Sequence, residues 1–326
     1  MRTVFDDLPT NDRVLVADGA MGTSLFELGL EPGGCPELLN VEQRDLIAKV
    51  HRGYVEAGSD IILTNTFGGN RCRLTLHGFE SRVTELNTAA VELAQGVARS
   101  APGPVAVAGS IGPTGELFAP LGNLTHDEGV DVFLEQAVAL ADAGADVLWI
   151  ETMSSFEELG AAVEAALQID LPITITMSFD TAGHTMMGVS PAALAEWVEN
   201  PRVVAVGANC GVGLTDNVAV VRDIAGNGME RAVIAKANCG VPLYQDGALA
   251  YPATALDMAD YVELAVRSGA RIVGACCGSS FDHISEIRKA VDRHPGGAIP
   301  TNDEIVARLG GAVPAVRRPA KRRRRA

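Results

Sequence analysis

Short apolar runs recur along the chain, and each is followed by a longer segment in which apolar residues return every three or four positions. The runs consist largely of Val, Ile and Ala, a composition typical of parallel strands that are buried on both faces. Eight runs are predicted as strands: residues 13–18, 60–65, 104–110, 146–152, 172–178, 203–210, 232–239 and 271–277.

The segments between the runs have the pattern of amphipathic helices. In residues 40–58, Leu46, Val50 and Tyr54 share one face, and Gly58 follows them as a stop signal. Strands that alternate with helices in this way predict an α/β protein, and specifically a single-domain (β/α)8 or TIM barrel. A doubly wound sheet is the alternative, but no G-x-G-x-x-G motif follows the first run.

Polar and reactive residues collect at one end of the predicted strands. The opposite ends carry residues such as Arg13, Pro172 and Arg271. The C-terminal ends carry, in order, Asp18–Gly19, Thr64–Asn65, Ser110, Glu151–Thr152, Ser178, Asn209–Cys210, Asn238–Cys239 and Cys276–Cys277. Since active sites of such barrels lie at the C-terminal ends of the strands, this one-sidedness predicts an enzyme.

Three thiols among these residues predict a metal site. Cys210 ends the sixth run and Cys276–Cys277 end the eighth, so in a closed barrel their sulfurs can face one point. Three protein ligands with one open position are typical of catalytic zinc. A buried cysteine as a small apolar residue and a vicinal disulfide are the alternatives, and Cys239 stays open as a fourth thiolate.

A zinc ion held by three thiolates has a net charge of about −1 and is a poor Lewis acid for activating water. It is well suited to holding a further thiol as thiolate, which is the nucleophilic form. The predicted chemistry is alkyl transfer to a substrate thiol, and zinc hydrolysis is the less natural interpretation.

Composition narrows the class of protein. The chain has 326 residues and a formal net charge of −15, although its last ten residues, RRPAKRRRRA, are strongly basic. An acidic body disfavours binding to nucleic acid and to anionic membranes. We place the barrel at residues 1–296 and a C-terminal extension at 297–326, with one short helix in TNDEIVARL and a basic tail that we expect to be disordered.

No apolar run approaches the length of a membrane span, and MRTVFDDLPTNDR lacks the apolar region of a secretory signal. Six cysteines in a chain of this length do not indicate a disulfide framework. We therefore expect a cytoplasmic protein whose partners are small molecules, with a homo-oligomer left open.

Six motifs carry a resemblance to a known family. VADGAMGTSL, DIILTNTFGGNR, GSIGPTGEL, WIETMSS, GANCGVG and GACCGSS resemble, in the same order, motifs of the homocysteine S-methyltransferase family of zinc-dependent barrels. Within it, the chain most resembles bacterial betaine–homocysteine S-methyltransferases. The homocysteine-binding module of cobalamin-dependent methionine synthase is nearly as similar. The resemblance covers residues 12–295.

The resemblance implies roles for individual residues. It implies Zn²⁺ on Cys210, Cys276 and Cys277. It also implies that Asn238 fills the fourth zinc position until substrate arrives.

For the substrate, the resemblance implies that Asp18 and Gly19 meet the amino-acid end of homocysteine, largely through backbone atoms. Thr64 would bind the same end, and Glu151 would bind the ammonium group. A zwitterionic amino acid does need a carboxylate for its ammonium. A structural acid paired with an arginine is the alternative for Glu151.

The expected reaction is methyl transfer from glycine betaine to homocysteine, giving methionine and dimethylglycine. Quaternary ammonium groups are usually held against aromatic faces, and Phe67 is the one aromatic residue predicted at the mouth. The tryptophan and tyrosine of the vertebrate betaine enzymes are replaced by PGGCPELLN and Gly68. Alternative donors are S-methylmethionine, S-adenosylmethionine, dimethylsulfoniopropionate or a methylated corrinoid protein acting in trans. From a different class, the chain would be a non-catalytic zinc- or thiol-binding barrel, or a redox sensor.

Overall fold

The computed structural model describes residues 5, 13–31, 33–241, 243–245, 248–293 and 296–311. The predicted basic tail lies outside the described residues. Within the described part of the chain, no helix is long and apolar enough to cross a bilayer.

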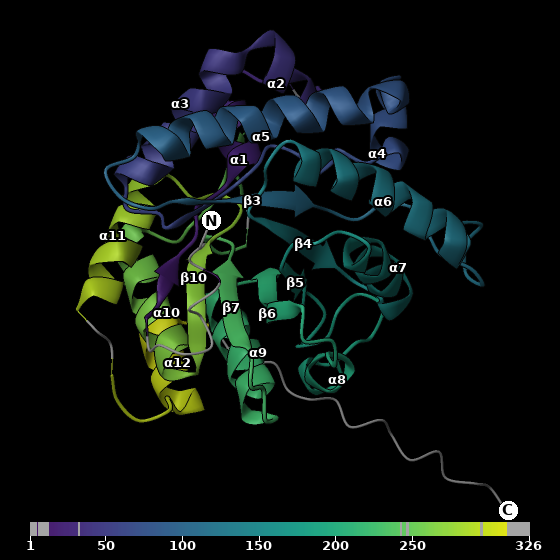
Figure 1. The fold of residues 1–326 in the computed structure, drawn as a ribbon. Helices are drawn as coiled ribbons and strands as arrows, with labels where there is room; N and C mark the ends of the chain where they lie inside the picture. The colour runs from purple at the N-terminus through teal and green to yellow at the C-terminus, as the bar shows by residue number, and fades with distance from the viewer. Residues whose placement is uncertain are drawn as a thin grey trace, which may run out of the picture.

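Eight parallel strands form the barrel wall, in the order β1-β10-β7-β6-β5-β4-β3-β2 (Figure 1). A parallel bridge between Ala17 and Ile61 joins the two ends of this order, supported by a hydrogen bond from the Asp60 N–H to the Val16 carbonyl at 2.7 Å. The strands are β1 (Leu15–Val16), β2 (Ile61–Leu63), β3 (Ala106–Ile111), β4 (Val147–Met153), β5 (Ile173–Met177), β6 (Val203–Cys210), β7 (Ala232–Ala237) and β10 (Ala270–Ala275). The predicted (β/α)8 barrel is confirmed.

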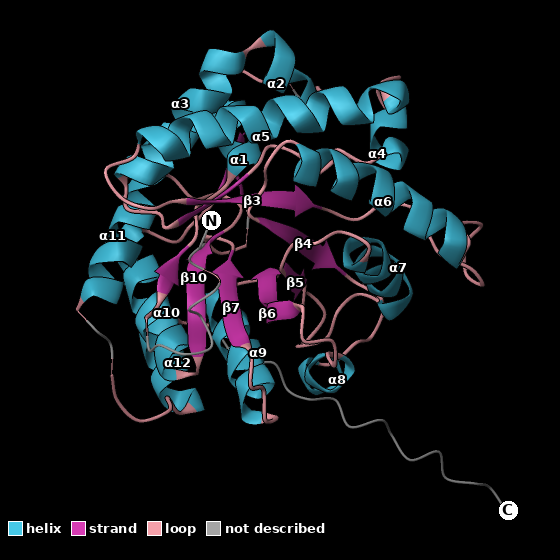
Figure 2. Ribbon diagram, viewed as in Figure 1, coloured by secondary structure: helices cyan, strands magenta, loops and turns pink. Residues whose placement is uncertain are grey.

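Helices surround the strands (Figure 2). The helices of the outer layer are α3 (Arg44–Glu56), α5 (Val83–Ser100), α6 (His126–Asp142), α7 (Phe156–Leu167), α8 (Pro191–Trp197), α9 (Leu214–Gly226), α10 (Ala255–Arg267) and α11 (Phe281–Asp292). Shorter helices follow β1 and β2: α1 (Met21–Glu27), the 3-10 helices Pro36–Leu38 and Glu80–Arg82, α2 (Leu39–Glu42) and α4 (Arg71–Thr75). A hairpin of β8 (Leu243–Gln245) and β9 (Ala248–Ala250) follows β7, and the apolar pattern did not predict this hairpin.

Local sequence explains where the helices begin and end. Thr125 and Thr254 start α6 and α10 with capping boxes, in which the threonine hydroxyl accepts the N–H of the third helical residue. Gly58, Gly144 and Gly269 follow α3, α6 and α10 with positive φ angles of 103°, 97° and 109°, and the stop predicted at Gly58 is confirmed.

The barrel interior is a packed core that supports the mouth from below. Its side chains alternate along the strands with those that face the helices, and Trp149 on β4 is its largest fully buried member. The Lys236 ammonium on β7 lies 5.7 Å from the centre of the Trp149 ring. The core therefore ends, toward the mouth, at a buried charge.

The short helix predicted in the C-terminal extension is α12 (Asn302–Leu309). It packs against α9 and α10. Arg308 pairs with Asp260 and Glu263 of α10, and Arg267 pairs with Glu304. These contacts attach the extension to the side of the barrel.

Candidate active site

A cavity of about 230 Å³ opens at the C-terminal ends of the strands. Most residues predicted for substrate and metal line this one cavity: Asp18, Gly19, Thr64, Phe67, Glu151, Cys210, Cys276 and Cys277. Asn238 is the predicted site residue that does not line it. Two further groups on its wall, Lys236 and Glu37, carry charge and were not predicted.

Cys210, Cys276 and Cys277 bring their sulfurs together. All three sulfurs lie within 4.8 Å of one another, and the Sγ atoms of Cys210 and Cys276 are 2.9 Å apart. The thiols are free, since a disulfide bond is about 2.05 Å long. Cys239 is fully buried outside this cluster, and burial raises the pKa of its thiol to about 12, so it behaves as an apolar side chain.

Backbone geometry explains how adjacent cysteines reach the same point. Side chains of neighbouring strand residues point to opposite faces, but β10 ends at Ala275, so both cysteines lie in the loop that follows. The loop turns at Gly278, whose φ is 81° and where a Cβ would lie 2.0 Å from the Tyr251 ring. Cys210 has a φ of 55°, an uncommon conformation for a residue other than glycine.

Asn238 connects the loop that follows Cys210 to the loop that carries Cys276 and Cys277. Its side-chain N–H donates to the Gly211 carbonyl at 2.9 Å, and its Oδ1 accepts the Cys277 N–H at 3.0 Å. In this conformation Asn238 positions the loops, and a role as a displaceable ligand requires Oδ1 to leave the Cys277 N–H.

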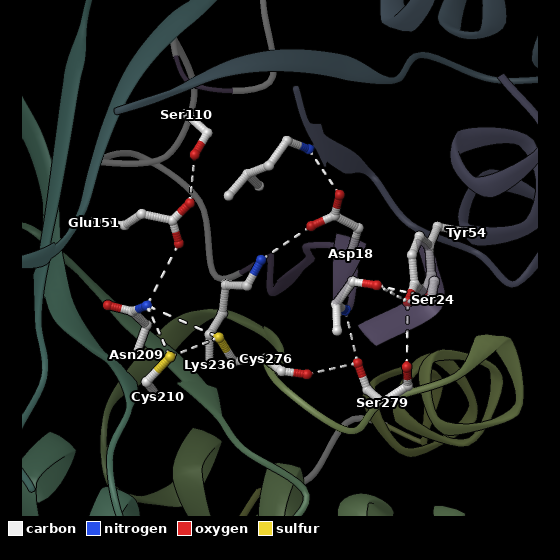
Figure 3. A network of polar contacts seen from close by, with 12 residues as sticks. Asp18, Ser24, Tyr54, Ser110, Glu151, Asn209, Cys210, Lys236, Cys276 and Ser279 are labelled. Carbon is white, nitrogen blue, oxygen red and sulfur yellow. Dashed lines mark hydrogen bonds and ion pairs between the residues drawn. The ribbon is translucent and has the colours of Figure 1, made fainter. Parts of the chain in front are cut away.

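Asn209 joins the thiols to the carboxylate of Glu151 (Figure 3). Its Oδ1 accepts the Thr152 N–H at 2.9 Å and the Thr176 hydroxyl at 2.7 Å. Its Nδ2 lies 3.4 Å from Glu151 Oε2 and 3.7 Å from Cys210 Sγ. Thr152, with a φ of 64°, is held in the left-handed region by this amide. Sequence analysis listed Asn209 at the end of a strand but gave it no role. Its position next to Cys210 was the available signal, because an amide that becomes buried there needs hydrogen-bond partners.

Glu151 points into the cavity from the end of β4. The Ser110 hydroxyl donates to its Oε1 at 2.6 Å, and burial raises the pKa of the carboxyl to about 7. Within the described residues no arginine pairs with it. The structural ion pair considered as an alternative is therefore not observed.

Asp18 and Lys236 form a buried ion pair at the base of the cavity (Figure 3). Lys236 Nζ is 3.0 Å from Asp18 Oδ1, each side chain is 3% exposed, and the Leu63 N–H donates to Asp18 Oδ2 at 2.8 Å. Burial favours the neutral amine, but Asp18 and Glu151 outweigh it and raise the pKa of Lys236, so this lysine is charged. Lys236 was not predicted as a site residue because it lies within an apolar run. A lysine in the middle of a buried strand nevertheless needs an acidic partner, which here is Asp18.

Thr64 and Gly19 are fixed by close contacts. The Thr64 hydroxyl accepts the Ser110 N–H at 3.0 Å and lies 2.6 Å from the Thr66 hydroxyl. A Cβ on Gly19 would lie 2.4 Å from Ser279 Oγ, which accepts the N–H of the next residue at 2.8 Å. The loop after β1 is thereby bound to the cysteine loop after β10.

A family model described as homocysteine S-methyltransferase matches residues 15–291. The chain belongs to the homocysteine S-methyltransferase family. The resemblance drawn from the six motifs is confirmed at this level.

Relatives of two kinds match the chain. The methionine synthases of Mycobacterium leprae and Mycobacterium tuberculosis are each 30% identical to this chain, over 94% and 86% of it, but the matches cover only 27% and 25% of those proteins. The chain thus spans about a quarter of their length. The metallated form of the homocysteine methyltransferase MmuM from Escherichia coli is 26% identical, with a TM-score of 0.70, over 86% of this chain and 97% of that one. The oxidized form of MmuM gives the same identity and TM-score.

The homocysteine S-methyltransferase fold here presents two kinds of group to one cavity. Three converging thiols are a soft donor set that can hold a metal ion. A carboxylate beside them can bind an ammonium group. The side-chain amide of Asn209 lies between the thiols and this carboxylate and contacts both.

Proposed function

We propose that this chain transfers a methyl group to the thiol of homocysteine to give methionine, with glycine betaine as the leading donor and dimethylglycine as the second product. The observation that carries the proposal is the convergence of three free thiols on a cavity that also contains a buried carboxylate. Homocysteine has a thiol at one end and an ammonium at the other, so it matches both.

The donor set fits zinc. Cys210, Cys276 and Cys277 would hold Zn²⁺, since thiolates are among its preferred ligands and a three-ligand site leaves one position for substrate. When bound, Zn²⁺ would supply a site at which the substrate thiol is held as thiolate near neutral pH. Its presence in this chain is part of the proposal.

The protein's own residues would fix the amino-acid end of homocysteine. Glu151 would receive the ammonium, held for this by the Ser110 hydroxyl and the Asn209 amide. Thr64 and the backbone at Asp18 and Gly19 would meet the carboxylate end. The carboxylate of Asp18 is already used by Lys236 and a main-chain N–H, which favours contact through its backbone.

Methyl transfer needs alignment more than acid–base catalysis. An S–CH₃ bond forms with an electron pair of the homocysteine thiolate, and the bond pair of the broken C–N bond stays on nitrogen, which leaves as a neutral amine. Holding both substrates in line in one cavity is the protein's main contribution, and such positioning lowers barriers by about 7–11 kcal/mol in favourable cases.

A second candidate is a homocysteine module that works with a methylated corrinoid protein. It is favoured by the 30% identity to methionine synthases of which the chain spans about a quarter. In that case the methyl group would be delivered by a corrinoid-carrying protein partner. No quaternary ammonium or sulfonium donor would then support turnover, whereas free methylcobalamin could replace the protein-bound corrinoid.

A donor panel tests the proposal. Zinc-loaded protein and homocysteine are incubated separately with glycine betaine, S-methylmethionine, S-adenosylmethionine, dimethylsulfoniopropionate or methylcobalamin, and methionine is measured. We expect methionine with glycine betaine. Methionine only with a sulfonium would change the donor, methionine only with methylcobalamin would favour the second candidate, and none with any donor would refute the activity.

A further inference from the structure

Glu37 is a buried carboxylate on the cavity wall. It lies in the 3-10 helix Pro36–Leu38 and is 5% exposed. Its Oε1 accepts the Gly68 N–H at 2.7 Å, and its Oε2 lies 3.4 Å from the Cys35 thiol, a neutral donor because burial raises its pKa to about 11. Within the described chain, no lysine, arginine or histidine forms an ion pair with Glu37.

The binding proposed for homocysteine leaves Glu37 without a role. Asp18 is paired with Lys236 at 3.0 Å, and Glu151 is the group assigned to the substrate ammonium. Glu37 is the third carboxylate on the same wall. The donors described for Glu37 are neutral, and a buried carboxylate without a counter-charge is costly. A third acid in the wall of a binding cavity therefore indicates a second ligand, which is cationic.

We propose that Glu37, together with the face of Phe67, forms the subsite for the positively charged centre of a small onium methyl donor, a quaternary ammonium or sulfonium compound. The proposal rests on the proposed function and adds to it the residue that recognises the positive charge of the donor. Phe67 lines the same cavity and is 38% exposed, so one of its surfaces is free to contact an alkylated cation.

Gly68 makes room for this carboxylate. A Cβ at position 68 would lie 2.9 Å from Glu37 Oε1, inside the distance at which the two atoms can coexist without a shift. Glycine at position 68 takes the place of the tyrosine found in the vertebrate betaine enzymes, and it lets the Glu37 carboxylate lie against the main chain. The negative charge of Glu37 would thus replace part of the aromatic surface that binds the cation in those enzymes.

The reaction itself predicts how Glu37 should act. As the C–N or C–S bond of the donor breaks, its electron pair remains on nitrogen or sulfur, which becomes neutral. The homocysteine thiol proton goes to solvent, and the thiolate pair forms the new S–CH₃ bond. Glu37 therefore attracts the donor more strongly than the transition state or the product, so its removal should raise the KM for donor with little loss of kcat.

Glu37→Gln tests this with one charge changed and the hydrogen-bond acceptor kept. With a donor that supports turnover, we expect its KM to rise about tenfold or more, while the KM for homocysteine and the bound metal stay as in the wild type. Glu116→Gln is the matched control, because it removes the same charge from an exposed position on the loop after β3. An unchanged donor KM in Glu37→Gln would overturn the proposal.

A binding experiment tests the subsite without turnover. Choline and 3,3-dimethylbutan-1-ol have the same shape and differ by one charge, so their affinities are compared by calorimetry on wild-type protein and on Glu37→Gln. We expect the wild type to prefer choline and the variant to lose that preference. Equal affinity of the wild type for the two compounds would overturn the proposal, even if the variant fails to fold.

The two proposals fail in different ways. If homocysteine methylation is wrong, the wild type forms no methionine with any donor. If only the onium subsite is wrong, the wild type forms methionine, but only with methylcobalamin, or with an onium donor whose KM does not respond to Glu37→Gln.

Discussion

The thiol wall of the cavity (Cys210, Cys276 and Cys277) and its carboxylate wall (Asp18, Glu37 and Glu151) are positioned by different means. The thiols depend on main-chain geometry: a left-handed residue at the end of β6, a glycine turn after β10, and an asparagine that bonds the backbone of both loops. The carboxylates are held largely by polar contacts with neighbouring side chains and N–H groups.

These two kinds of support predict which substitutions each wall should tolerate. A wall built from backbone conformation keeps its shape when one side chain is removed, and loses only that ligand. A wall held by polar contacts loses stability when one partner is removed, because the carboxylate or the ammonium that remains is left buried without it. Asn209 belongs to both walls, so its substitution should affect both.

Cys276→Ala should give the largest functional effect. Bound zinc should be lost and methionine formation should fall by more than about 100-fold, with the melting temperature little changed, because the residue lies in a loop. Elemental analysis and methionine production measure this. Cys239→Ala, which removes a buried thiol outside the cluster, should keep its metal. Wild-type rates in Cys276→Ala would remove this thiol from the reaction.

Lys236→Met should give the largest effect on stability. It leaves Asp18 buried without its partner, so the free energy of unfolding should fall by about 3–5 kcal/mol. Adding Asp18→Asn to this variant should recover most of the loss. Denaturant unfolding of the two single variants and the double variant measures the coupling, and additive losses would show that the pair is not an energetic unit.

Glu151→Gln should weaken homocysteine binding by about 10- to 100-fold and leave the metal in place. Burial raises the pKa of Glu151 to about 7, so the carboxyl is charged above that pH and neutral below it. The affinity of the wild type for methionine, which has the same amino-acid end and no thiol to titrate, should therefore rise as the pH increases through 7. An affinity in Glu151→Gln that follows the same pH curve would contradict the assignment.

Asn209→Asp should give a smaller effect on both walls at once. The change replaces the N–H group near Glu151 Oε2 and Cys210 Sγ with an oxygen. We therefore expect metal affinity to fall about tenfold and the KM for homocysteine to rise about tenfold. Thr176→Val removes one hydrogen bond to the other end of the same amide and should affect both less. A change in only one of the two quantities would show that the walls are independent.

The fold was largely readable from the chain because buried parallel strands are almost entirely apolar. Each of the eight predicted runs overlaps one barrel strand, and the run at 203–210 has the predicted bounds. The thiol cluster was also predictable, since three cysteines at two strand ends and a following glycine leave few other arrangements.

The polar partners were less readable. Lys236 lies within an apolar run. Only the closed barrel shows that it contacts Asp18, which is far from it in the sequence. Glu37 lies in a loop whose path no periodicity predicts. The number of hydrogen bonds that the Asn209 amide makes depends on three strands meeting at one edge, which is a property of the folded protein alone.

The ring of Trp149 under the Lys236 ammonium gives the molecule a built-in optical reporter. The chain has two tryptophans, and the other, Trp197, stacks on Phe156 in the outer layer of helices. Because indole emission responds to nearby charge, filling the cavity or changing its charge should alter the fluorescence of Trp149. Trp197→Phe would leave Trp149 as the sole tryptophan, so ligand binding could be measured by fluorescence titration without a label.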